Sequence, residues 1–436
     1  MKRSTLVVSI ALLLTACLPS NVQVPQSPLL PLLERKSGLI VYVGLDWNIY
    51  TSDQAGRNLK AHTTDANATG DASAAYRFYV YPAWSPDGKS LGYVSVSGQG
   101  TESNAEIFIT DVEEEVTKKV YSSQTEQPFY LYWSPDNTNL SFLASTPGGG
   151  SMILQSVSAE REERTILDIG SPYYWSWAPD GKTMIIHTGS ANSATPPHLS
   201  FLKVDDQVVE NGIDELPGTF QAPAWSPNGQ RILMTRVNEQ EQKEIVVLNG
   251  RGDFEQSIGT FELNTAFAWS NDNSTVAYIE GKEDVGNGTL GTLHVVDLET
   301  SEDLFQDENV LAFFWSPSGE KLAYFIPTAS EAASQGGETD SAAQEQQLLL
   351  QLKVLDVKNS ESRELFTFRP SGQFTAILPY FDQYHQSATI WSPDDNNLVL
   401  SFLTADGAPG IAIVAASGQL EPRLLTQGYL AFWSPK

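Results

Sequence analysis

The chain has 436 residues, of which 26 are Lys or Arg and 53 are Asp or Glu, and its formal net charge is −27 at pH 7. So few dispersed cations cannot form a basic face for phosphate contacts, and we therefore expect no nucleic-acid partner. Because Cys17 is the only cysteine, a disulfide within the chain is excluded.

The first 17 residues have the pattern of a bacterial lipoprotein signal peptide. Lys2 and Arg3 precede an apolar run from Leu6 to Ala16, which has the length of a secretory signal and is too short to span a bilayer. The run ends in "LTAC", which resembles the lipobox whose cysteine is lipidated after cleavage. The alternative is a signal peptide cleaved elsewhere. We expect lipidation at Cys17, an extracytoplasmic location at the periplasmic face or cell surface, and membrane attachment through this lipid anchor only.

A tether and a single domain follow. Residues 18–37 contain four prolines and little hydrophobic pattern, which is typical of a semi-rigid spacer. From residue 38 to residue 436 one sequence pattern repeats to the end of the chain. We therefore expect one domain, and we expect it to be monomeric.

The repeat is a tryptophan followed by a turn and an alternating strand. "WSPDGKSLGYVS" begins at Trp84, and near-copies begin at Trp133, Trp177, Trp225, Trp269, Trp315 and Trp391, with a fragment at Trp433. Most intervals between these tryptophans are 42 to 49 residues. This period is typical of the four-stranded antiparallel blades of a β-propeller. In the turn, Pro presets its own backbone angle and Gly tolerates a positive φ.

One interval, from Trp315 to Trp391, is 76 residues long. It contains a polar, low-complexity segment at 328–347, which predicts a loop inserted within one blade. The stretch "RPSGQFTAILPYFDQYHQ" before Trp391 accounts for the remaining excess. We expect this second insertion to be a loop as well.

A second signal gives an independent count of the blades. Eight short apolar stretches have the pattern of the third strand of a blade, near Ile49, Phe108, Ile153, Phe201, Val246, Val295, Val354 and Ile413. The first has no preceding tryptophan motif, and the motif at Trp433 has no strands after it. We predict an all-β fold with eight blades, closed by the C-terminal strand pairing with the strands at 39–62, which leaves no open edge. Seven blades are the alternative.

The Trp-Ser-Pro-Asp-Gly repeat resembles that of the TolB-type β-propellers, over the chain from about residue 39 to residue 436. The resemblance implies an extracytoplasmic scaffold that binds proteins or other ligands. Similar repeats also occur in sugar lyases and in the gating propellers of prolyl peptidases, so the resemblance concerns the fold more than the activity.

The long, variable loops are all expected on one face of the propeller, where loops between the second and third strands meet those between blades. Aromatic residues precede several motif tryptophans on this face, and tyrosine is favoured at recognition surfaces. The alternative is that these side chains only fill the blade cores. The candidate ligand-binding residues are Tyr79, Tyr81, Tyr130, Tyr132, Tyr174, Tyr380, Phe381, Tyr384 and His385.

Catalytic signatures are scarce. The sequence has no Gly-x-Ser-x-Gly elbow, and its five histidines lack the paired spacing of a metal site. We therefore expect no catalytic residue, metal or cofactor, although acidic turns such as "FQDENV" leave weak calcium binding open. The favoured hypothesis is a non-catalytic envelope lipoprotein that binds a protein, peptide or glycan. The alternative is a carbohydrate-active lyase or hydrolase with carboxylates or His385 near the channel mouth.

Overall fold

The computed structural model describes residues 37–68, 74–146, 148–158, 164–190, 193, 196–205, 207–285, 288–328 and 348–436. The chain divides into two compact units, Met1–Arg35 and Lys36–Lys436, and the second contains all of these residues. The expected signal peptide, Cys17, the tether up to residue 36 and the low-complexity loop from residue 329 lie outside the described residues. Within these ranges, no helix has the length and apolar character needed to cross a membrane.

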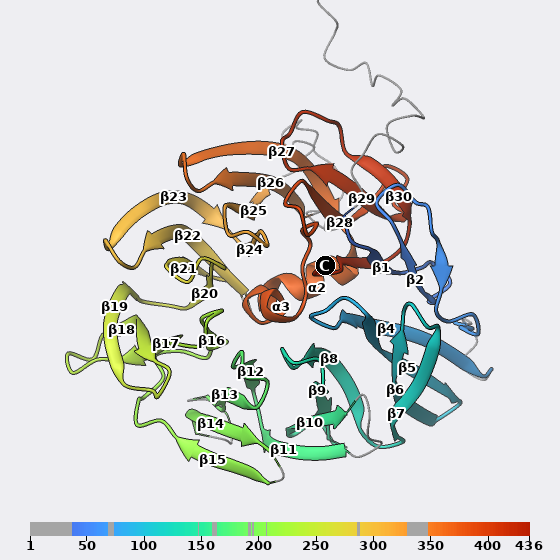
Figure 1. Ribbon diagram of the computed structural model, residues 1–436, viewed down its shortest axis with the longest axis horizontal. Helices are drawn as coiled ribbons and strands as arrows, with labels where there is room; N and C mark the ends of the chain where they lie inside the picture. Colours follow the sequence, from blue (N-terminus) through green and yellow to red (C-terminus); the bar gives the residue numbers. More distant parts are fainter. Residues whose placement is uncertain are drawn as a thin grey trace, which may run out of the picture. The chain divides into compact units, whose positions relative to one another are not determined.

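The described residues form an all-β propeller. Six sheets have four antiparallel strands each, in consecutive order from the centre outward except where β31 is added to β1 (Figure 1). These sheets contain β31 (Leu430–Trp433), β1 (Ile40–Val43), β2 (Ile49–Ser52) and β3 (Lys60–Ala61); β4 (Tyr76–Trp84), β5 (Ser90–Gln99), β6 (Glu102–Asp111) and β7 (Val116–Ser123); β8 (Gln127–Trp133), β9 (Asn139–Ser145), β10 (Met152–Ser158) and β11 (Arg164–Gly170); β12 (Tyr173–Trp177), β13 (Thr183–Thr188), β14 (His198–Val204) and β15 (Val208–Gly212); β16 (Ala224–Trp225), β17 (Arg231–Val237), β18 (Lys243–Asn249) and β19 (Phe254–Phe261); and β20 (Thr265–Trp269), β21 (Thr275–Val285), β22 (Gly288–Asp297) and β23 (Glu302–Val310).

The seventh sheet is longer than the others. It has seven strands, β24 (Ala312–Trp315), β25 (Lys321–Thr328), β26 (Leu349–Asp356), β27 (Glu361–Pro370), β28 (Asn397–Leu403), β29 (Pro409–Ala415) and β30 (Arg423–Gln427). Its two parts, β24 to β27 and β28 to β30, are joined by only two residue pairs between β27 and β28.

The two ends of the described chain lie in one sheet. Strand β31 pairs antiparallel with β1, with Val41 opposite Phe432 and Ile40 opposite Trp433. The C-terminal fragment of the repeat therefore supplies the innermost strand of the sheet that the N-terminal strands begin.

Burial along the strands explains why the inner strands are apolar and the outer ones are not. Strand β9 is buried at five consecutive residues because neighbouring sheets cover both of its faces. The outermost strand of the preceding sheet, β7, is exposed over its first four residues. Continuous apolar runs are the expected pattern for strands that are covered on both faces.

The motif tryptophans pack between neighbouring sheets, as their repetition predicts. Trp133 Nε1 donates a hydrogen bond to the Ala83 carbonyl of the preceding sheet at 3.1 Å. The same contact recurs from Trp269 to the carbonyl of Ala224, at 3.0 Å, and from Trp391 to that of Phe314, at 2.9 Å. Each of these three indoles thus satisfies its only donor while it covers the neighbouring sheet.

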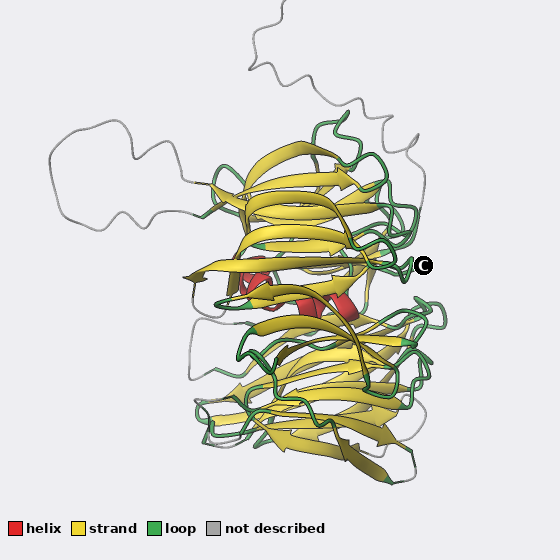
Figure 2. Cartoon of the chain, turned by 90° about the vertical axis from the view of Figure 1, so that its left-hand side faces the viewer, coloured by secondary structure: helices red, strands yellow, loops and turns green. Residues whose placement is uncertain are grey.

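The insertion before Trp391 differs from the expected surface loop. Residues Gly372–Ile377 form α2, Leu378–Tyr380 form a 3-10 turn (η2), and Phe381–Ser387 form α3. Both helices lie at the centre of the ring of sheets (Figure 1), and the side view places them among the strands (Figure 2). The apolar residues of the insertion, including Phe374, Ile377 and Phe381, are buried, which explains why it is helical and central rather than a solvated loop.

Candidate functional site

Helix α3 is fixed at the centre of the propeller by the Gln383 amide. Gln383 Nε2 donates to the Tyr130 hydroxyl at 2.9 Å and to the Trp175 carbonyl at 2.8 Å, and its Oε1 accepts from Trp175 N at 3.0 Å. The Tyr130 hydroxyl in turn donates to the Gln383 carbonyl at 2.7 Å. One buried side chain therefore connects α3 to the innermost strands β8 and β12.

Two further polar side chains of α3 reach the residues just before β16. Asp382 Oδ2 accepts from Ala222 N at 3.2 Å, and Gln386 Nε2 donates to the Pro223 carbonyl at 3.1 Å. Burial raises the pKa of Asp382 to about 6, against the opposing effect of these backbone donors. The carboxyl group is thus held in an environment that disfavours its charge.

The opposite side of α3 is apolar. Phe381 packs edge-on against Phe313 of β24, with ring centroids 4.8 Å apart, and His385 packs against Phe314 at 6.1 Å. Burial lowers the pKa of His385 to about 4, so the imidazole is neutral at physiological pH. This side of the helix is part of the protein core.

A pocket of about 800 Å³ lies beside α3, and we call it the central pocket. Its walls come from α2, α3 and the innermost strands or preceding loops of several sheets. Its aromatic lining consists of Tyr81, Phe129, Tyr130, Tyr173, Tyr174, Phe220, Tyr380, Tyr384 and Phe432, and its polar lining includes Ser190, Thr219, Gln221, Asn264, Thr265, Thr289, Gln373, Asp382, Gln383 and Ser387. A volume of this size suits a small-molecule ligand or a short segment of a larger one.

The aromatic walls of the central pocket are held by stacking. The rings of Tyr174 and Phe220 are parallel within 13°, with centroids 4.6 Å apart. Tyr130 packs edge-on against Tyr384 at 4.9 Å. Tyr81 is the most accessible of these residues, with 37% of its surface exposed. The pocket therefore offers ring faces and edges in fixed orientations.

Two amide side chains that line the pocket have unsatisfied polar atoms. Gln221 is only 2% exposed, yet neither its Oε1 nor its Nε2 has a hydrogen-bond partner among the described residues. Asn264 Nδ2 donates to the Gly288 carbonyl at 3.0 Å, but its Oδ1 also lacks a partner there. An unsatisfied buried polar group costs about 1 to 3 kcal/mol, so these atoms are candidates for pairing with a ligand.

Of the nine sequence-predicted residues, five meet in the central pocket: Tyr81, Tyr130, Tyr174, Tyr380 and Tyr384. Phe381 is 1% exposed and lies in the core, and His385 faces Phe314. Tyr132 is 8% exposed and packs 6.1 Å from Trp175. These last three, together with Tyr79, do not line the pocket, and ligand binding by them stays a prediction.

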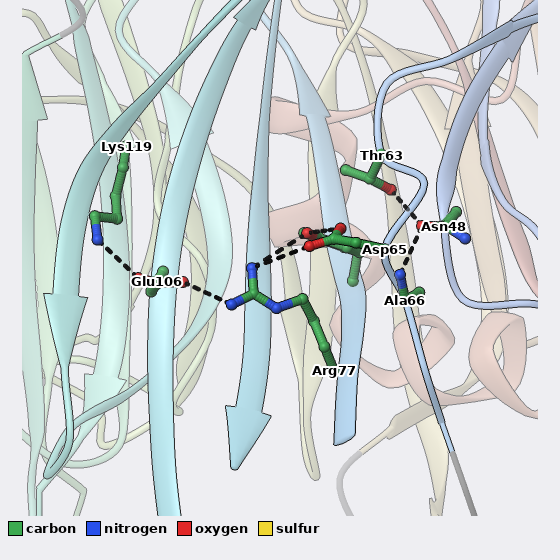
Figure 3. Close-up of polar contacts among 8 residues, drawn as sticks. Asn48, Thr63, Asp65, Ala66, Arg77, Glu106 and Lys119 are labelled. Carbon is green, nitrogen blue, oxygen red and sulfur yellow. Dashed lines mark hydrogen bonds and ion pairs between the residues drawn. The ribbon is translucent and has the colours of Figure 1, made fainter. Parts of the chain in front are cut away.

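Tyr79 belongs to a separate polar network on β4. Its hydroxyl donates to Asp65 Oδ1 at 2.6 Å. Arg77 lies between Asp65 and Glu106, at 3.5 and 3.8 Å, and Lys119 pairs with Glu106 at 2.9 Å (Figure 3). Every charged side chain in this network has an ion-pair partner within it. We therefore interpret these residues as a structural cluster.

Four polar residues of the pocket were not among the candidates predicted from the sequence: Gln221, Asn264, Asp382 and Gln383. Asp382 and Gln383 lie within the insertion, whose excess length was the available signal. Gln221 and Asn264 lie in stretches with no distinguishing motif, and only the ring places them at one pocket. Within the described ranges, no three or more His, Cys, Asp or Glu side chains are grouped so that they could hold a metal ion.

No protein-family model matches this sequence, and no curated protein matches it. Solved structures do match. The dihydro-heme d1 dehydrogenase NirN aligns over 96% of this chain and 78% of its own, with 13% identity and a TM-score of 0.52. The β-propeller domain of the Trilobed protease from Pyrococcus furiosus aligns over 81% of this chain and 98% of its own, with 11% identity and a TM-score of 0.43. TolB from Acinetobacter baumannii has 18% identity and a TM-score of 0.37; the alignment covers 61% of this chain and 62% of the TolB chain.

These likenesses concern the fold. TolB-type and other propeller proteins are among the matched structures. Oligogalacturonate lyases and prolyl endopeptidases are also among them. Because these matches have identities of only 11 to 18%, function has to be argued from the central pocket itself.

Proposed function

We propose that this protein is a non-catalytic binding protein of the bacterial cell envelope, anchored through a lipid on Cys17. Its propeller would capture a ligand, either a segment of a protein, a peptide or a glycan, at the central pocket and the loop-rich face around it. The lipobox supports the anchoring, as does the lack of any later segment in the sequence that is long and apolar enough to cross a membrane.

The unpartnered Gln221 amide in an aromatic pocket carries this proposal. Stacked tyrosine and phenylalanine rings give affinity for apolar or ring-shaped groups, and a few fixed polar atoms give specificity. Gln221 Oε1 and Nε2 are buried without partners among the described residues, so a ligand that reaches and pairs with both would remove this cost.

The polar lining of the pocket favours binding over catalysis. Among the described lining residues Asp382 is the only carboxyl group, whereas glycoside hydrolysis by the usual route needs two. His385, the residue considered for an enzyme, packs against Phe314 on the other side of α3. A carbohydrate-active lyase or hydrolase stays the alternative hypothesis, and turnover of oligosaccharides would establish it.

We also infer that the propeller has eight blades and that β31 closes the ring. Dividing the seven-stranded sheet between β27 and β28, where only two residue pairs join the strands, gives two blades. The isolated bridge between Trp391 and Leu398 supplies the inner strand of the second one. The pairing of β31 with β1 supports the closure. Removal of residues 430–436 should then make thermal unfolding much less cooperative.

The binding proposal is tested by ligand capture with a soluble form that starts at residue 18. Bait protein would be exposed to solubilised envelope extract and to a glycan array. The matched variants are Tyr81→Ala, at the pocket, and Phe254→Ala, an exposed aromatic residue outside it. We expect Tyr81→Ala to lose the ligand and Phe254→Ala to retain it. Equal capture by all three forms would contradict the assignment of the pocket.

A further inference from the structure

We propose that the central pocket binds a protonated amine, with Asp382 as the counter-charge and the surrounding tyrosine and phenylalanine rings as the walls. The ligand class is a small organic primary amine, such as an amino sugar or an aliphatic amine. This inference rests on the proposed binding function and adds the chemistry that the ligand must present.

The charge of the pocket is the first argument. Its described lining contains Asp382 but no Lys, Arg or His. Each Asp382 oxygen accepts one backbone N–H, from Ala222 at 3.2 Å and from Gln383 at 2.9 Å, and no ion pair of Asp382 is found among the described residues. Buried carboxylates are usually paired with a cation, and none of the described lining residues supplies one here.

The aromatic rings that line the pocket together with this carboxyl group are the second argument. Burial raises the pKa of the Tyr174 hydroxyl well above its ordinary value, and the negative charge of Asp382 raises it further. Tyr174 itself stacks on Phe220. An ammonium group is attracted both by a carboxylate and by the faces of aromatic rings, whereas a neutral hydroxyl gains much less from either.

The unpartnered amides are the third argument. Gln221 and Asn264 line the central pocket together with Asp382, and Gln221 directly precedes Ala222, whose N–H donates to Asp382. Gln221 Oε1 and Asn264 Oδ1 are buried and have no hydrogen-bond partner among the described residues, and an ammonium group carries three N–H donors that could pair with such acceptors. Gln221 Nε2 remains as a donor for a hydroxyl or carbonyl elsewhere on the ligand.

These observations also exclude a ligand class. An acidic sugar such as a uronic acid would place its carboxylate beside Asp382, with no cation in the lining to balance either group. We therefore expect galacturonate not to bind in this pocket.

The test is calorimetric titration of the soluble form with pairs of probes that differ in charge. The first pair is the glucosamine trimer and its N-acetylated counterpart, and the second is 1,5-diaminopentane and 1,5-pentanediol. We expect the amine of at least one pair to bind about tenfold or more tightly than its neutral partner, because only the amine gains the ionic and ring contacts. The two pairs distinguish an amino-sugar source from an aliphatic one.

Variants connect this binding to the pocket. Asp382→Asn should lose about tenfold or more in amine affinity while leaving neutral ligands unaffected. Tyr81→Ala should weaken every pocket ligand, and Phe254→Ala should weaken none. If Asp382→Asn does not fold, Gln221→Leu takes its place, because it removes an unpartnered acceptor from the lining of the pocket.

The outcomes separate this inference from the proposed function. If the N-acetylated trimer binds as well as the amine, and Tyr81→Ala abolishes both, the central pocket is a binding site but the amine assignment is wrong. If no probe binds, the amine assignment is also overturned, while capture from the envelope extract still decides the proposed function. Amine binding that Asp382→Asn leaves unchanged would contradict the role of this residue.

Discussion

The Gln383 side chain hydrogen-bonds to both the backbone N–H and the carbonyl of Trp175, at 3.0 and 2.8 Å, although 208 positions separate the two residues. A strand in the interior of a sheet would normally offer these groups to a neighbouring strand. Here the innermost strand β12 has no neighbour toward the channel, and a helical side chain takes that place. The insertion is therefore part of the structural core of the propeller, and it also forms one wall of the central pocket.

Replacing Gln383 should destabilise the whole propeller. Gln383→Ala leaves the Trp175 N–H and carbonyl and the Tyr130 hydroxyl without this partner in a buried environment, and we expect a loss of about 2 to 4 kcal/mol. Chemical denaturation followed by tryptophan fluorescence measures it. Gln419→Ala, at an exposed turn, is the control and should change little. A loss below that of the control would mean that α3 contributes no structural support.

Two motif tryptophans allow a matched test of the contact between sheets. Trp133 Nε1 donates to the Ala83 carbonyl, whereas Trp84 Nε1 is buried without a partner in the described residues. Trp133→Phe and Trp84→Phe remove similar apolar surface, but only the first also breaks a hydrogen bond. We expect Trp133→Phe to cost about 1 kcal/mol more in thermal or chemical unfolding. Equal losses of unfolding free energy would show that these tryptophans contribute to stability through burial alone.

The buried histidines predict loss of stability in acid. Burial lowers the pKa of His187 and of His385 to about 4, so both bind protons more readily when the protein unfolds. Above pH 6.5 these two histidines do not reduce the free energy of unfolding. As the pH falls toward 4, each of them lowers the free energy of unfolding by about 2 to 4 kcal/mol. Asp382, whose pKa burial raises, acts in the opposite direction, whereas His62, whose pKa burial also lowers to about 4, adds to the loss.

Unfolding free energies at pH 7 and pH 4.5 check this prediction. The parent protein should be less stable at the lower pH, and His385→Gln should show a smaller decrease than the parent. Equal stability at the two values would mean that the two histidines are protonated in the folded protein without cost.

Asp382 predicts a pH effect of the other sign. Its pKa of about 6 in the folded protein lies above the ordinary value of 3.8, so the folded state holds the proton more firmly. The carboxyl group therefore costs stability as the pH rises from 4 to 6. The free-energy difference between Asp382→Asn and the parent should shift by about 2 to 3 kcal/mol in favour of the variant between pH 4 and pH 7. A constant difference across this range would show that the carboxyl group is solvated.

Much of the strand pattern could be predicted from sequence because its determinants are local. The Trp-Ser-Pro-Asp-Gly turn specifies its own backbone within five residues, and the alternating strand after it follows from short-range hydrophobic pattern. Trp175 precedes the motif tryptophan Trp177 by two residues, which places both on one face of a strand, and it is fully buried. Tyr81, Tyr130 and Tyr174 could be predicted because they precede motif tryptophans on innermost strands, whereas Tyr380 and Tyr384 lie in the insertion.

The insertion and the polar part of the pocket depended on tertiary structure. Taken alone, "RPSGQFTAILPYFDQYHQ" is too short and too irregular to indicate a stable helix, since isolated helices of this length are marginal in water. Its helices are held by partners such as Tyr130, Trp175 and Phe313, which lie far away in sequence. The sequence by itself thus determined the repeating strands, through local turns and periodicity. Only the assembled ring decided that Gln221, Asn264 and Asp382 share one pocket, because that proximity arises from contacts among separate sheets.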